Sequence, residues 1–291
     1  MENVHYLVTR FLFHAFGKEL AISDIIFQSG GCINMSVKAE TDFGSFFIKW
    51  NELEQKDLFE KEVSGLKMLK GKSSLIVPEV INYGVVEEKI YLVMEFLEQR
   101  VDDSKAQQRL GEGLAELHGY SSKYIGFEES NYIGKLSQNN EYSSSWVKFF
   151  KEKRLGVQLG LAIYENRVDQ KFVEQFKNFL DLLHHLIPES QPALLHGDLW
   201  SGNTLSTVNG PAIFDPAVYF GAVEMDIAMT KLFGGFSDAF YDAYRANGFL
   251  NPQFDDLVDI YNLYPLMVHV NLFGADSGYL GTVKKIISRY L

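Results

Sequence analysis

The sequence predicts an α+β fold with two lobes, a small antiparallel-sheet lobe over residues 1–97 and a larger, mainly helical lobe over residues 98–291. Short apolar runs with strand-like alternation gather in the first part, whereas helical periodicity dominates from about residue 104. No flexible linker divides the two parts. The length of 291 residues and a hydrophobic content of 46% are enough to bury a large core.

The small lobe is expected to begin with an N-terminal helix and to continue with paired strands. A strand–turn–strand unit is predicted over 29–50, because two glycines separate runs of alternating apolar residues. A helix is predicted over 57–69, where apolar residues recur at helical spacing. A last pair of strands is predicted near 78–84 and 90–97. This order gives a sheet-based lobe with one internal helix.

In the larger lobe, helices are expected to be interrupted by loops at 119–145 and 187–220. The segment 172–183 carries an aromatic and leucine stripe that is typical of a helix packed on a core. The second loop region contains the most informative motif of the chain, the octapeptide His-Gly-Asp-Leu-Trp-Ser-Gly-Asn at 196–203.

Within that motif, Asp198 precedes Asn203 by five positions, and Asp215 follows in Ile-Phe-Asp-Pro. This is the spacing of a kinase catalytic loop, in which the Asp accepts the proton of the substrate hydroxyl and the Asn holds magnesium. Asp215 occupies the place of the main magnesium ligand of a kinase. The pattern predicts a phosphotransferase that uses ATP and Mg²⁺. The alternative is an unrelated Asp/Asn loop whose turn carboxylates are satisfied locally.

The earlier segments supply the rest of a nucleotide site. Gly30 and Gly31 let the backbone approach phosphate oxygens. Lys49 ends an apolar strand, as does the kinase lysine that pairs with the α- and β-phosphates and with a helix glutamate. Glu62 is the expected partner, although Glu60 fits the helical periodicity equally well. Each signal is weak alone, and their order along the chain gives them weight.

The end of the last strand is expected to pass between the lobes, so that the backbone near Glu95, Phe96 and Leu97 bonds adenine. Cys32 is the only cysteine, which rules out an intrachain disulfide and a cysteine-rich zinc site. It lies in the ATP-binding glycine segment and is a candidate redox residue. The bland alternative is a small residue that fits a tight turn. A lone cysteine permits a linked dimer without implying one, so the oligomeric state stays open.

The composition of the chain argues against two classes of partner, nucleic acids and membranes. A formal net charge of -11 without basic clusters argues against nucleic-acid binding. No apolar run approaches the roughly 20 residues of a membrane span, and the N-terminal residues lack a secretory pattern. We therefore expect a cytoplasmic enzyme with no membrane association.

At this level of detail the chain resembles the fructosamine kinase family, also called ketosamine 3-kinases, which are relatives of aminoglycoside phosphotransferases and, more distantly, of protein kinases. The stretches that carry the resemblance span most of the chain: 30–34, 47–51, Tyr-Ile-Gly-Phe-Glu-Glu-Ser-Asn-Tyr-Ile-Gly at 124–134, 146–155, the octapeptide, 215–221 and Phe-Gly-Gly-Phe at 233–236. The Leu-Trp-Ser-Gly-Asn, Asn-Tyr-Ile-Gly and Trp-Val-x-Phe-Phe stretches are specific to this family.

The resemblance implies a protein-kinase-like fold and ATP-dependent phosphorylation of the sugar 3-hydroxyl of ketosamines, either small molecules or glycated proteins. Such phosphorylation makes the adduct labile, which implies a role in deglycation repair. Carried over by position, Asp198 becomes the base, Asn203 and Asp215 the magnesium ligands, Lys49 the phosphate lysine and Glu62 its partner.

Three further positions follow from the resemblance or lie beside the motifs. Asp226 matches a helix-start Asp that braces the catalytic loop. Trp200 and His269 are candidate substrate contacts, and core packing is the alternative for each. One departure is visible, because Ala222-Val223 stands where many members carry an Asp-Arg pair. We expect the loss of this arginine to alter substrate preference or local bracing and to leave the phosphate machinery intact.

Two other hypotheses remain. A kinase of aminoglycosides or other amino alcohols would share the base and metal ligands but would favour a more acidic substrate cleft. A catalytically silent nucleotide-binding scaffold is disfavoured by the complete set of Lys49, Asp198, Asn203 and Asp215.

Overall fold

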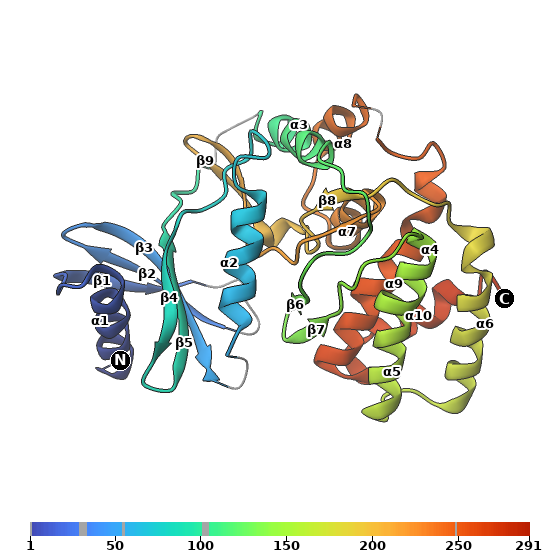
Figure 1. The fold of residues 1–291 in the computed structure, drawn as a ribbon, viewed down its shortest axis with the longest axis horizontal. Helices are drawn as coiled ribbons and strands as arrows, with labels where there is room; N and C mark the ends of the chain where they lie inside the picture. The colour runs from blue at the N-terminus through green and yellow to red at the C-terminus, as the bar shows by residue number, and fades with distance from the viewer. Residues whose placement is uncertain (1, 29–33, 54–55, 101–104, 248) are drawn as a thin grey trace.

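The computed structural model describes residues 2–28, 34–53, 56–100, 105–247 and 249–291 of the chain. Figure 1 shows a sheet with two helices on one side of the molecule and a cluster of helices on the other. The predicted α+β class, with an antiparallel sheet in the N-terminal part and helices in the C-terminal part, is confirmed. The division at residue 97 stays a prediction.

The N-terminal sheet has five antiparallel strands in the order β1-β2-β3-β5-β4. Its two faces are covered by different helices, because alternate side chains of a strand point to opposite faces. Tyr91 and Val93 of β5 belong to a core shared with helix α1, whereas Leu92 and Met94 belong to the core that contains α2. The bounds are α1 Glu2–Phe16, β1 Ile22–Phe27, β2 Met35–Thr41, β3 Gly44–Glu52, α2 Leu58–Leu69, β4 Val80–Val86 and β5 Lys89–Glu95.

The C-terminal part is built around helix α9, which is buried along most of its 20 residues. It packs against α5, α7 and α10. A π-helical turn at Phe150–Leu155 joins α4 and α5. The helices are α3 Ala106–His118, α4 Trp146–Phe149, α5 Gly156–Tyr164, α6 Gln170–Leu186, α7 Glu224–Phe233, α8 Asp238–Arg245, α9 Phe254–Phe273 and α10 Tyr279–Ile287.

Six short strands lie in the intervals that the sequence pattern predicted as loops. They form three two-stranded sheets, β6–β7, β9–β10 and β8–β11. Strands of three or four residues are too short for an alternation signal, which explains why periodicity did not reveal them. Their bounds are β6 Asn131–Ile133, β7 Leu136–Gln138, β8 Ala193–Leu195, β9 Thr204–Thr207, β10 Gly210–Ile213 and β11 Tyr219–Gly221.

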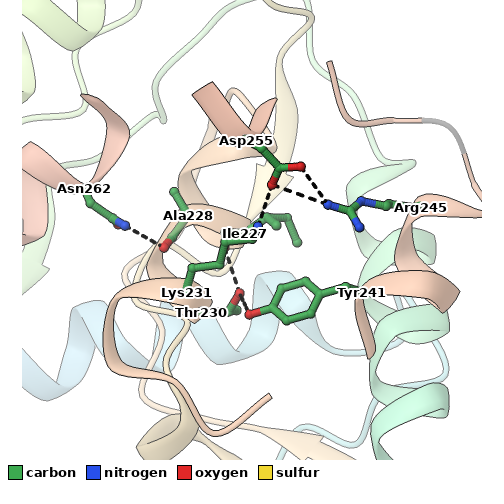
Figure 2. A network of polar contacts seen from close by, with 8 residues as sticks. All are labelled: Ile227, Ala228, Thr230, Lys231, Tyr241, Arg245, Asp255 and Asn262. Carbon is green, nitrogen blue, oxygen red and sulfur yellow. Dashed lines mark hydrogen bonds and ion pairs between the residues drawn. The ribbon is translucent and has the colours of Figure 1, made fainter. Parts of the chain in front are cut away.

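Helix α7 is tied to its neighbours by polar contacts (Figure 2). Lys231 pairs with Asp255 at 2.6 Å, and Arg245 reaches the same carboxylate at 3.2 Å. The Asn262 amide donates to the Ala228 carbonyl of α7 at 2.8 Å. These contacts fix α7 between α8 and α9. In the part of the chain that the structure describes, no helix is long and apolar enough to span a membrane.

Candidate active site

The octapeptide begins directly after strand β8, which pairs with β11. Gly197 follows with φ +81°, and an added Cβ would lie 2.1 Å from the Ala217 carbonyl oxygen. A side chain would therefore be blocked by both backbone conformation and lack of space. Gly202 is constrained by space alone, because a Cβ there would lie 2.2 Å from the Trp200 ring. The two glycines set the path of the loop on either side of Asp198.

Asp226, near the start of α7, holds the beginning of this loop. Its carboxylate accepts hydrogen bonds from the backbone amides of His196 at 2.7 Å and Gly197 at 2.9 Å. The His118 imidazole lies 3.2 Å from the same carboxylate. Asp226 is only 1% exposed, so its charge is balanced by amides and an imidazole in place of water.

His196 links the loop that carries Asp198 to the segment before Asp215. Its Nε2 lies 3.0 Å from the Phe214 carbonyl oxygen, which can only accept, so Nε2 carries the proton. Its Nδ1 then accepts a hydrogen bond from the Asp198 amide at 3.3 Å. Burial lowers the pKa of His196, which favours this neutral form. The ring thus ties the backbones of Asp198 and Phe214 together.

Asp198 and Asn203 are in direct contact. The Asn203 amide donates to the Asp198 carboxylate at 3.1 Å and to its backbone carbonyl at 2.9 Å. Burial and the nearby Asp215 carboxylate raise the pKa of Asp198 to about 7, against the opposing hydrogen bond from Asn203. A carboxylate with that pKa is a competent proton acceptor near neutral pH.

Lys49, Glu62 and Asp215 come together from three separate segments. The Lys49 ammonium lies 2.6 Å from the Glu62 carboxylate and 2.8 Å from that of Asp215. Burial by itself lowers the pKa of Lys49, but Asp215 and Glu62 outweigh it and the pKa is raised. Burial raises the pKa of Glu62. Glu60, the alternative left open by periodicity, is exposed on the other face of α2.

Asp215 has a backbone φ of +55°, a left-handed conformation that non-glycine residues adopt rarely and often at functional sites. Its side chain is 39% exposed, although one oxygen contacts Lys49. Asn203 uses its amide nitrogen toward Asp198, which leaves the amide oxygen for another partner. One carboxylate and one amide oxygen fit Mg²⁺, which takes few protein ligands and completes its shell with phosphate and water. The described residues contain no group of three or more His, Cys, Asp or Glu side chains placed to hold a metal by themselves.

Two cavities meet at these residues. One has a volume of about 310 Å³ and the other of about 380 Å³. Both are lined by Asn34, Lys49, Asn203 and Asp215. Asp198 lines only the larger one. A group that passes from one cavity to the other must therefore pass the lysine and the two magnesium-ligand candidates.

The smaller cavity, here called the hinge cavity, is bordered by Glu95, Phe96 and Leu97 at the end of β5. The Glu95 and Phe96 amides already donate to the Glu79 and Ser45 carbonyls at 3.0 and 3.3 Å. Hydrogen bonds to an adenine ring in this cavity are therefore left to the other backbone groups of the segment. The predicted ATP-binding residues Gly30, Gly31 and Cys32 lie outside the described residues.

The larger cavity, here called the acceptor cavity, contains both candidate substrate contacts. Trp200 packs edge-on against Phe233 with ring centroids 6.0 Å apart, and Phe233 lies 5.1 Å from His269. The His269 Nδ1 donates to the Pro265 carbonyl at 2.7 Å, because that oxygen can only accept. Burial lowers the pKa of His269. The neutral ring then presents Nε2 as an acceptor.

Sequence reasoning missed most of the acceptor cavity wall. Its far end is apolar or aromatic and comes from α7, α9 and α10: Met229, Phe233, Val268, Leu272, Phe273 and Tyr279. Phe233 stood in a stretch that carried the family resemblance, which was an available signal. The other wall residues lie in helices whose apolar pattern indicates packing in general and no particular cavity.

The structure also shows where Ala222 and Val223 lie, the two residues that stand in place of the expected Asp-Arg pair. Both side chains are buried, and the next residue, Glu224, is only 5% exposed. One Glu224 oxygen accepts from the Asn251 amide at 3.3 Å, while the other makes no hydrogen bond. Burial raises the pKa of Glu224. The departure therefore lies in the packing beside α7, and neither residue lines the two cavities.

Comparison with known families is consistent with this geometry. A model of the fructosamine kinase family matches residues 5–291. The chain belongs to the fructosamine kinase family. This family member is 38% identical over 278 residues to a probable ketoamine kinase of Vibrio parahaemolyticus, a match that covers 93% of this chain and 94% of the relative. It is 39% identical over 283 residues to a chloroplastic protein-ribulosamine 3-kinase of Arabidopsis thaliana, covering 94% of this chain and 85% of the relative.

Among solved structures, this fructosamine kinase family member superposes on a candidate fructosamine-3-kinase from Haemophilus somnus with a TM-score of 0.85. The two chains are 26% identical, and the match covers 98% of this chain and 96% of the other. The predicted family and the kinase-like fold are confirmed, and the protein is a phosphotransferase by family.

Proposed function

We propose that the protein transfers the γ-phosphoryl group of ATP to the 3-hydroxyl of ketosamines, the adducts of sugars with amines. The observation that supports this most is the meeting of the hinge and acceptor cavities at Lys49, Asn203 and Asp215, with Asp198 on the acceptor side only. In this proposal, ATP occupies the hinge cavity with its adenine near Glu95, Phe96 and Leu97. The ketosamine occupies the acceptor cavity.

The residues divide the chemistry among them. Asp198 accepts the proton of the acceptor hydroxyl, whose oxygen forms a bond to the γ-phosphorus as the bond to the bridging β–γ oxygen breaks. ADP leaves with the electron pair of the broken bond. Lys49, oriented by Glu62, holds the phosphates. Asp226 and His196 hold the loop that carries Asp198.

Asn203 and Asp215 are the proposed ligands of Mg²⁺, and their oxygens suit that ion. When bound there, the ion neutralises charge on the phosphates. The Lys49 ammonium lies 2.8 Å from the Asp215 carboxylate, so the lysine orients one proposed ligand as well as the phosphates.

The acceptor cavity favours ketosamines over polycationic amino sugars. Outside the catalytic set, its described lining includes aromatic rings, the neutral acceptor His269 and the paired Lys61, and contains no further carboxylate. A site for several ammonium groups requires acidic partners. Trp200 is proposed to cover one face of the sugar and His269 to accept a hydrogen bond from it. Glycated proteins or small ketosamines are the proposed substrates, and removal of sugars from amines the proposed role. A cytoplasmic location stays a prediction.

The test is a phosphorylation assay with Mg²⁺ and ATP on a panel of ribulosamine, erythrulosamine, fructosamine and aminoglycoside acceptors. Asp198→Asn is run in parallel, and the phosphorylated position is assigned by NMR. We expect phosphate on the 3-hydroxyl of at least one ketosamine and a loss of about 10²- to 10⁴-fold in the variant.

Transfer to an aminoglycoside in preference to every ketosamine would reject the proposed acceptor while leaving the kinase assignment intact. No transfer to any acceptor, with ATP still bound, would favour a silent nucleotide-binding protein. Undiminished activity of Asp198→Asn would remove the proposed base.

A further inference from the structure

Helix α2, which carries Glu62, starts in an unusual way. Asp57 precedes the helix at the position where an aspartate ordinarily accepts a hydrogen bond from a backbone amide of the first turn. Here its side chain makes no such bond. The carboxylate accepts a hydrogen bond from the Tyr132 hydroxyl at 2.7 Å instead. The start of α2 is thus attached to the β6–β7 hairpin, 75 residues further along the chain.

A second contact joins the same two elements one turn later. The Lys61 ammonium lies 2.6 Å from the Glu129 carboxylate, just before β6, and both side chains are half-buried. Lys61 holds the pKa of Glu129 below its usual range, and burial, together with the hydrogen bond to Asp57, raises the pKa of Tyr132. Figure 1 shows the hairpin between α2 and the C-terminal helices, and α2 and β6 are in contact.

The hairpin is firmly held on its other side. Asn131 is buried, and its amide donates to the Val218 carbonyl at 2.8 Å. Gln138 donates to Asn131 at 2.8 Å and to the Ala217 carbonyl at 3.1 Å. The Tyr264 hydroxyl of α9 donates to Gln138 at 2.7 Å. These bonds anchor the hairpin to Ala217 and Val218, which follow Asp215 by two and three residues.

We propose that the β6–β7 hairpin is a latch that holds α2 in place, and that Tyr132 is a positioning residue for the Lys49–Glu62 pair. The hairpin fixes the start of α2 through Asp57 and Lys61, and Glu62 is the next residue after Lys61. If α2 shifts, the Glu62 carboxylate leaves Lys49, and the phosphate lysine loses its orientation relative to Asp215. Tyr132 acts through α2 and is no proton carrier.

The latch also connects the two substrates. Tyr132, Ile133 and Gly134 line the acceptor cavity together with Leu58 and Lys61 of α2. An acceptor in that cavity rests on the hairpin and the helix at once. Its binding therefore favours the arrangement in which Lys49 is aligned for ATP, and ATP and acceptor strengthen each other's binding. This part rests on the proposed function.

The experiment compares Tyr132→Phe, which keeps the ring and removes the bond, with Asp57→Ala and with the double variant. Tyr142→Phe is the control, because Tyr142 is 57% exposed and lines neither cavity. Hydrogen exchange of the α2 amides and the Kd of Mg²⁺·ATP are measured without acceptor. The kcat and acceptor KM are measured with the best acceptor.

We expect Tyr132→Phe to speed exchange in α2 and to lower kcat about tenfold, with the acceptor KM changed less than about threefold. Asp57→Ala should have the same effects on exchange and on kcat. The double variant should lose no more kcat than either single variant. Exchange in α2 equal to that of Tyr142→Phe would overturn the latch. So would a change confined to the acceptor KM, or additive losses in the double variant. If the parent phosphorylates no ketosamine, the proposed function fails, and hydrogen exchange in α2 still decides whether the latch exists.

Discussion

The hinge and acceptor cavities share one cluster of polar residues, and the rest of their walls is built in different ways. The polar residues shared by the two cavities come from short motifs, each fixed by nearby hydrogen bonds or ion pairs: Lys49 by Glu62 and Asp215, and Asn203 by Asp198. The far wall of the acceptor cavity comes from three helices and is apolar. We propose from this difference that phosphate transfer depends on exact polar partners, whereas acceptor choice depends on apolar packing.

The strongest test of this contrast is Lys49→Met. Lys49 is 3% exposed and contacts two carboxylates. Without the ammonium, the phosphates lose a preorganised charge, and we expect kcat to fall about 10²- to 10³-fold with every acceptor. Steady-state kinetics with two different acceptors measures this.

Because the Glu62 and Asp215 carboxylates would then lie near each other without the ammonium between them, the melting temperature is measured alongside. Lys49→Arg serves as a second variant that keeps the charge. Lys151→Met is the matched control, since Lys151 pairs with Asp181 on the surface at 2.7 Å. A fall in kcat with one acceptor only would contradict the proposal that Lys49 serves phosphate transfer and not acceptor choice.

The pH profile sharpens the comparison from the side of the base. In the proposed mechanism Asp198 accepts a proton as a carboxylate, and burial and Asp215 raise its pKa to about 7. We expect kcat/KM to fall tenfold per pH unit below about 7 and to level off above it. The measurement is an initial-rate series between pH 5 and 9.

Burial raises the pKa of Glu62 as well, so the series is repeated with Glu62→Gln. The acid limb should persist in that variant, although its rates are lower. If the acid limb disappears in Glu62→Gln, the titrating group is Glu62. The pH profile then gives no support to Asp198 as the base.

Acceptor choice should respond to a change that leaves the chemistry alone. Phe273 lines the acceptor cavity and is 47% exposed, so Phe273→Asp removes apolar contact area with little cost to the core. We expect kcat/KM for a ketosamine with an apolar amine to fall about tenfold, and the preference to shift toward cationic amines. Phe249→Asp is the control, because Phe249 is 43% exposed and lines neither cavity. Equal effects at the two positions would show that the wall does not select the amine.

The sequence predicted the parts of the molecule that depend on local motifs. The loop from 196 to 203 and the helix over 57–69 were predicted because each carries its own spacing signal, and the helix is observed at Leu58–Leu69. Lys49 was predicted to end an apolar strand, but β3 continues past it to Glu52. Glu62 and Glu60 could not be separated by periodicity, since the choice depends on how α2 faces the sheet. The hairpin at 131–138 was predicted as a loop, because its strands are three residues long and are held by tertiary bonds from Asn131 and Gln138. The acceptor wall depends on contacts between distant helices.

The smallest expected effect concerns stability. The pKa of Asp198 is higher in the folded protein, at about 7, than in an unfolded chain, so the folded state binds the additional proton between about pH 4 and 7. Stability contributed at this position is therefore present at low pH and is lost as pH rises toward 7. Asp198→Asn removes the titration, and its melting temperature should match the parent near pH 4 and exceed it by a few degrees above pH 7. Asp181→Asn is the control, because the pKa of Asp181 is lowered by Lys151 and the sign reverses. A difference in melting temperature that stays constant from pH 4 to above pH 7 would mean that ionisation of Asp198 does not destabilise the folded state. The raised pKa of Asp198 would then be wrong.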